Sequence, residues 1–198
     1  MSGKERWEID GSNSELGFSL RHIVVSEIQG RFRSWGGEML FDPEDVARAQ
    51  IQVWIDVASI ETGSADRDAH LRSSEFMDVT QFPRAQFTSS DVSIRREGEA
   101  LIRGRLQLHG VTCDVELLVA AQRTWTDARG LAHASYRVRG NLDRQAFGLH
   151  WNQDLDVGGI VVGDKVQIDA RVELVRAAHA GFARTVPAGA NAAPAEPA

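Results

Sequence analysis

The histidines and the one cysteine are the residues whose chemistry could support metal binding or proton transfer. The histidines are scattered without the short spacings of metal ligands, and Cys113 has no second cysteine for a zinc thiolate site or an internal disulfide. Cys113 is therefore expected to be a small buried apolar side chain. Nucleophile elbows, phosphate-binding loops and dinucleotide glycine patterns are absent from the sequence. We expect no metal, no cofactor and no catalytic residue.

The most chemically loaded segment is Arg67-Asp68-Ala69-His70-Leu71, which places a cation, an anion and an imidazole in one turn. One interpretation is a polar latch over the entrance to a ligand site. The other is a helix start, in which Asp68 complements the positive helix N-terminus and Arg67 pairs with a neighbouring carboxylate. The sequence alone leaves both interpretations open.

An enzymatic alternative would combine His22, Asp68, His70 and Arg144 as an acid/base cluster. His22 shares the alternation of Leu16, Phe18 and Leu20, so it should point inward at a strand end. Such an inward histidine is either a core residue or a ligand contact. Proton transfer would need these groups within hydrogen-bond reach of one another, which spacing cannot establish.

The elements that must position these residues are strands, because apolar residues recur with a period of two. Five long segments show this alternation, and shorter ones lie near Phe18, Phe32 and Phe87. The five are residues 50–57, 102–109, 111–119, 134–139 and 166–174.

About eight strands result, a number at which an antiparallel sheet can close into a barrel. The pair Gly36-Gly37 interrupts one strand and predicts a β-bulge there. Three connections look like hairpin turns with glycine at positive φ, at Gly98, Gly110 and Gly130. Short turns favour an all-β meander closed into a barrel.

Two segments depart from the strand pattern. Residues 66–77 are good helix formers opened by Asp66 as a candidate N-cap, which predicts a short helix near the barrel mouth. Residues 177–198 are rich in alanine and proline with few large apolar residues, so they predict a disordered tail. We therefore expect one folded domain over residues 1–176.

The composition and net charge of the chain limit the classes of partner that it can bind. A chain of 198 residues with 42% hydrophobic content can bury one sizeable core, and a net charge of −6 has the wrong sign for tracking phosphates. Nucleic acid is not an expected partner. The N-terminus lacks the apolar stretch of a leader or membrane anchor, so we expect a cytoplasmic protein without an integral membrane segment, or a periplasmic one if a leader has been removed. A homodimer is compatible with the sequence.

A series of short motifs runs along the chain from Trp7 to Val175. The motifs are Trp7-x-Ile9-Asp10, Gly17-Phe18-Ser19-Leu20-Arg21-His22, Gly30-Arg31-Phe32, Phe41-Asp42-Pro43, residues 58–63, Arg67-Asp68-x-His70-Leu71, Phe76, Phe82-Pro83, Phe87-x-Ser89, Gly104-x-Leu106, residues 109–112 and Asp143-Arg144-x-x-Phe147-Gly148. In the identity and order of these motifs the chain resembles the YceI-like family, a lipocalin-like fold associated with polyisoprenoid binding.

The chain departs from the family pattern at three points. Asn13-Ser14 stands where His-Ser is usual, so no role transfers to that imidazole, and Cys113-Asp114 replaces a usual proline. Many members also carry a secretory leader. The resemblance therefore implies the fold of this chain more directly than its role in the cell.

The resemblance implies that the barrel interior carries or stores a long apolar lipid, such as a polyisoprenoid, an isoprenoid quinone or a fatty-acyl derivative. Periodicity alone fits a ligand-free scaffold filled by its own side chains equally well. The polar candidates at the mouth are Arg67, Asp68, His70 and Arg144. The candidate ligand contacts are the inward positions Phe18, Leu20, His22, Phe32, Val53, Ile55, Leu106, Leu108, Leu117, Val138 and Ile168.

Overall fold

Strands of alternating apolar and polar residues dominate the computed structural model, which describes residues 4–22, 27–42, 45–150 and 162–177, with the backbone alone at residues 21, 22 and 162. The elements in chain order are β1 Glu5–Ile9, β2 Glu15–His22, β3 Glu27–Phe32, β4 Trp35–Asp42, β5 Asp45–Asp56, η1 Val57–Ser59, β6 Ile60–Glu61, α1 Ala65–Arg72, β7 Arg84–Arg96, β8 Glu99–Leu108, β9 Val111–Thr126, β10 Ala132–Asp143, η2 Gln145–Phe147 and β11 Val162–Arg176.

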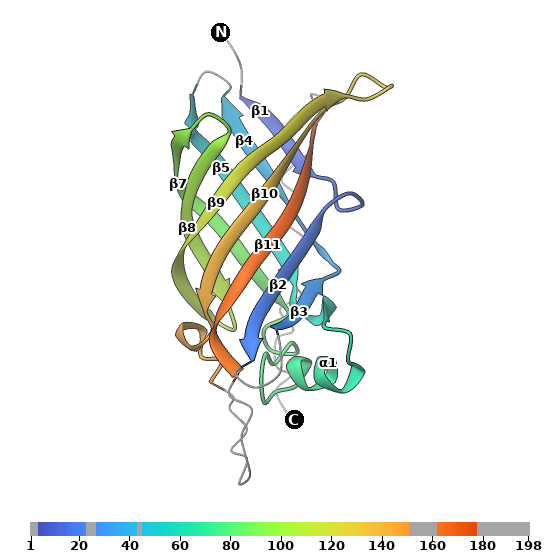
Figure 1. Cartoon of the computed structure of the whole chain (residues 1–198), viewed down its shortest axis with the longest axis vertical. Coiled ribbons are helices and arrows are strands. Elements are labelled where there is room, and N and C mark those ends of the chain that lie inside the picture. Colours follow the sequence, from blue (N-terminus) through green and yellow to red (C-terminus); the bar gives the residue numbers. More distant parts are fainter. Residues whose placement is uncertain (1–3, 23–26, 43–44, 151–161, 178–198) are drawn as a thin grey trace, which may run out of the picture.

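These strands form a closed antiparallel barrel with eight positions around it (Figure 1). Three positions hold two strands end to end. β11 pairs with β1 near Leu174 and with β2 from Val162 to Arg171, so β1 and β2 follow one another along one edge. β3 and β4 pair with β2 and β1 in the same way, and β5 and β6 pair with β4 and β3. The eight-stranded barrel predicted from the sequence is confirmed.

The predicted hairpin turns are also confirmed. Gly98, Gly110 and Gly130 all have positive φ, and they join β7 to β8, β8 to β9 and β9 to β10. His109 shares the left-handed conformation with Gly110, at φ 50° and 73°. Positive φ at both central residues gives the turn a twist that matches the flanking strands.

The bulge predicted at Gly36-Gly37 is wrong. Both glycines pair in regular register with Trp54 and Val53, and the register shift of this strand pair lies between Leu40 and Asp42. Gly36 leaves room for the Trp54 ring, since a Cβ there would lie 2.9 Å from the ring. A Cβ on Gly37 would lie 2.3 Å from the carbonyl oxygen of Gln52. These glycines therefore permit close approach and do not mark an extra residue.

The helix is shorter than predicted and begins earlier. Its N-cap is Ser64 instead of Asp66, and it ends at Arg72, where Ser73 donates from its N–H and its hydroxyl to the carbonyl of His70. α1 lies at the end of the barrel where β2 ends (Figure 1). Residues 178–198, where the sequence predicts a disordered tail, lie outside the described part of the chain.

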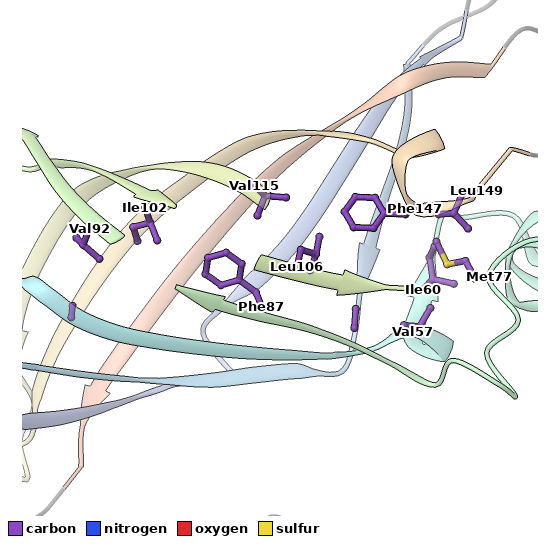
Figure 2. Packing of buried hydrophobic residues seen from close by; sticks show 12 residues of the cluster. Val57, Ile60, Met77, Phe87, Val92, Ile102, Leu106, Val115, Phe147 and Leu149 are labelled. Atoms are coloured by element: carbon purple, nitrogen blue, oxygen red, sulfur yellow. The ribbon is translucent and has the colours of Figure 1, made fainter. Parts of the chain in front are cut away.

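The core runs along the barrel axis. Figure 2 shows Phe87, Leu106 and Val115 pointing into the space between the strands, with a second group around Phe147 and Ile60 at the α1 end. At the opposite end Trp7 packs on Phe41 with ring centroids 6.2 Å apart. Among the described residues, no helix has the length and apolar character needed to cross a membrane.

One prediction concerns Gly104 in β8. A Cβ there would lie 2.5 Å from the Phe87 ring and 2.5 Å from the carbonyl oxygen of Thr88, so Gly104→Ala must move backbone. We expect a loss of about 1–3 kcal/mol in the free energy of unfolding, measured by chemical denaturation. Gly11→Ala is the control, because its Cβ would meet nothing closer than 3.9 Å. Equal stability of the two variants would contradict the close packing described at Gly104.

Candidate functional site

An inner cavity of about 230 Å³ lies within the barrel, and its lining is almost entirely apolar. Closed apolar cavities of about 150 Å³ in other proteins stay dry and bind small hydrocarbons. The lining includes nine of the inward residues predicted from the sequence, namely Phe18, Phe32, Val53, Ile55, Leu106, Leu108, Leu117, Val138 and Ile168. Their inward orientation follows from the period-two alternation and barrel closure.

A wider mouth cavity of about 770 Å³ opens beside α1. Leu20, another predicted residue, lines this cavity and not the inner one. The side chain of His22 lies outside the described part of the chain. Residues 60–77 and 142–149 supply much of the remaining wall. The apolar members from these two ranges are Ile60, Leu71, Phe76, Met77, Leu142, Phe147 and Leu149.

Leu71 and Phe76 were expected from the sequence to face inward, but the other wall residues were not, because most of them lie in turns, a short helix or the two-residue strand β6, where no alternation marks them. Phe147 is only 2% exposed although it belongs to η2. Its carbonyl lies 3.3 Å from Nδ1 of His109, and the neighbouring carbonyl of Ala146 accepts from Cys113 at 3.5 Å. Cys113 is half-buried instead of buried. These contacts hold η2 against the β8–β9 turn.

The inner and mouth cavities adjoin at five side chains that line both. We call this ring the waist, and each member comes from a different strand. The members are Phe18 of β2, Phe32 of β3, Leu108 of β8, Leu142 of β10 and Ile168 of β11.

Three glycines in the barrel wall keep space inside it. A Cβ on Gly30 would lie 2.3 Å from the ring of Phe18, and a Cβ on Gly140 would lie 2.6 Å from Cδ2 of Leu117; Gly104 and Phe87 have the same relation. In each case a large side chain lies flat against a neighbouring strand, as aromatic residues do over glycines in other sheets. The large side chains therefore line the cavity without filling it.

The predicted polar segment ties α1 to Thr62, the residue that follows β6. Asp68 is buried and accepts from the N–H and the hydroxyl of Thr62, at 2.9 and 2.5 Å. Arg67 donates to the hydroxyl and the carbonyl oxygen of Thr62, both at 2.8 Å. The expected pairing of Arg67 with a carboxylate is replaced by this shared contact with Thr62. Arg67 lines the mouth cavity, whereas Asp68 is not among its lining residues.

Arg144 and His70 also line the mouth cavity. Arg144 is buried and donates to the carbonyls of Leu149 and Gly163 and to the carboxylate of Asp164, at 2.7, 3.2 and 3.0 Å. It thereby fastens the segment after β10 to the start of β11. Nδ1 of His70 lies 3.7 Å from Oε2 of Glu75. Of the four residues in the enzymatic alternative, the structure brings His70 and Arg144 to one cavity and directs Asp68 to Thr62.

Among the described residues that line the inner cavity, the one charged residue is Glu38, and its half-exposed carboxylate pairs with Arg6 at 2.7 Å. Burial raises the pKa of Tyr136, so this phenol in the inner cavity is neutral at pH 7. Hydrogen bonds from Arg33 and Arg31 lower the pKa of Glu61 to about 2 on the outer side of β6. The inner cavity is therefore suited to an uncharged apolar guest.

Solved structures with this fold include BcnA of Burkholderia cenocepacia, with a TM-score of 0.72 and 22% identity over 83% of this chain and 98% of that one. A polyisoprenoid binding domain from Saccharophagus degradans has a TM-score of 0.61 and 16% identity, covering 86% of this chain and 98% of that one. At such identities the likeness shows a common fold.

Sequence relatives are closer. A UPF0312 protein of Yersinia enterocolitica is 33% identical over 85% of this chain and 84% of its own length. Protein YceI of Salmonella newport is 33% identical over 71% of this chain and 73% of its own length. The family model described as the YceI-like domain matches residues 7–174. The resemblance seen in the motifs is thus confirmed, and this chain belongs to the YceI-like domain family.

Proposed function

We propose that this protein binds a long apolar lipid inside its barrel and carries or stores it. The observation that carries the proposal is the pair of adjoining apolar cavities, one inside the barrel and one at the α1 end. Burial of an apolar chain there removes it from water, which contributes about 25 cal/mol per Å² of buried surface. The cavities also argue against a barrel filled by its own side chains.

The ligand classes we propose are a polyisoprenoid, an isoprenoid quinone or a fatty-acyl derivative. A long chain suits this space because the inner and mouth cavities follow one another and share a ring of apolar side chains. The fold shared with a structure described as a polyisoprenoid binding domain supports the first class.

Binding fits the polar groups at the mouth better than catalysis does. The carboxylate of Asp68 is engaged by Thr62, and the guanidinium of Arg144 is engaged by two carbonyls and Asp164. These contacts hold α1 and the segment after β10 in place over the mouth cavity. Groups held in this way shape the entrance to the ligand site.

Leu106→Trp tests whether a chain occupies the inner cavity. Leu106 lines that cavity, so the larger ring should occupy volume that the ligand needs. We expect the affinity for long chains to fall more than the affinity for short ones, while the free energy of unfolding of the free protein changes little. Titration with prenyl alcohols of increasing length, beside chemical denaturation, measures both. Gln107→Trp is the matched control, since Gln107 is exposed and lies next to Leu106 on the opposite face of β8.

A filled core would respond differently. There the Leu106→Trp ring would overpack the interior and lower the free energy of unfolding by about 1–3 kcal/mol. That loss, together with no binding of any chain by the unaltered protein, would contradict the proposed function.

Asp68→Ala tests whether α1 controls ligand exchange. Removing the carboxylate breaks both contacts with Thr62 and loosens a helix at the edge of the fold. We expect faster release of a bound fluorescent fatty acid, measured by stopped-flow displacement, with a stability loss of no more than about 1–3 kcal/mol. The control is Asp114→Ala, which removes the same charge from an exposed position of β9 that lines neither the inner nor the mouth cavity. Unchanged release with a clear stability loss would show that Asp68 only supports the fold.

A further inference from the structure

We propose that Phe18, seated on Gly30, is the residue that admits a lipid chain from the mouth cavity to the inner cavity and so determines the chain length that the protein accepts. This inference rests on the proposed function. It assigns to one side chain of the waist a role in selecting the ligand.

The position of Phe18 is the first argument. It lines both the inner and the mouth cavities, and its ring centroid is 5.6 Å from that of Phe32, the waist residue of the next strand. The other waist residues face the same boundary from three more strands. A chain that reaches the inner cavity from α1 must therefore pass these side chains.

The packing of Phe18 against Gly30 is the second argument. These two residues are direct cross-strand partners in β2 and β3. A Cβ on Gly30 would lie 2.3, 2.8 and 2.9 Å from three atoms at the tip of the ring. The ring therefore occupies the space of the missing side chain and lies against the wall, which leaves the passage beside it open.

Gly30 differs from the other two wall glycines in what an added methyl group would meet. At Gly104 and Gly140 the Cβ would also crowd backbone oxygens, those of Thr88 and Glu116. At Gly30 the three nearest atoms all belong to the free end of the Phe18 side chain. A methyl group there can be accommodated by rotation of the ring away from the wall, which directs it into the waist.

Gly30→Ala is therefore the decisive variant, and the readout is affinity for prenyl alcohols of two and of eight isoprene units. We expect the affinity for the long chain to fall by roughly tenfold or more, a change of about 1.4 kcal/mol, while the short chain binds the mouth cavity as before. Gly11→Ala, whose Cβ would meet nothing closer than 3.9 Å, should leave both affinities unchanged.

A second substitution separates a blocked passage from a damaged fold. In the double variant Gly30→Ala/Phe18→Leu the smaller side chain clears the waist, so long-chain affinity should return toward that of the unaltered protein. Thermal melting of each variant checks folding. If Gly30→Ala is misfolded, it should lose affinity for both prenyl alcohols, and Phe18→Leu should not restore it. That result would overturn the proposal.

The remaining outcomes separate this inference from the proposed function. If the unaltered protein binds both chains and Gly30→Ala keeps the same preference, Phe18 does not control the passage, although lipid binding stands. If the unaltered protein binds neither chain, the proposed function fails and the inference fails with it.

Discussion

The pairing of β1 with β11 is the constraint on which the rest of the structure depends. It joins the first strand to the last and turns an open sheet into a barrel. Closure gives every alternating strand an inside, so the apolar residues of eight strand positions converge on one axis. Without that pairing the same residues would form one apolar face of a sheet, with edges open to other chains. The site is thus a consequence of closure more than of any local motif.

Closure alone does not leave an empty interior, because large side chains from eight directions could fill it. Glycines at particular points in the wall prevent this. Gly30, Gly104 and Gly140 each let a large neighbouring side chain lie along the sheet instead of standing in the lumen. The absence of a side chain at these positions therefore helps to keep the cavity open, together with the apolar residues that line it. Substitution there affects either the fold or the space inside it, depending on what the new atom meets.

The barrel could be predicted from the sequence because strand alternation and glycine turns are local signals with a direct physical cause. The inward orientation of Phe18, Leu106 and Ile168 follows from the same period. The prediction of a bulge at Gly36-Gly37 was wrong. Gly36 makes room for the ring of Trp54 on the neighbouring strand, and in the sequence such a glycine cannot be told apart from one that bends the chain.

The mouth could be predicted only in part. Arg67, His70 and Arg144 all line the mouth cavity. The partners of the two arginines are Thr62, the carbonyls of Leu149 and Gly163 and the carboxylate of Asp164, which no spacing rule identifies. Asp68 was expected at the rim but is instead the buried residue of α1, where its carboxylate accepts a hydrogen bond from the N–H of Thr62. Phe147 lines the mouth cavity from the short helix η2 after β10. The alternation of apolar and polar residues has ended there, so it could not indicate that this side chain is buried.

Native mass spectrometry of the protein purified from cells tests the central claim most directly. Our account predicts a retained apolar molecule at one copy per barrel, which an added long-chain lipid displaces at the same stoichiometry. A protein that is empty as purified, and that takes up no member of a panel of prenyl alcohols, isoprenoid quinones and fatty acids, would contradict it.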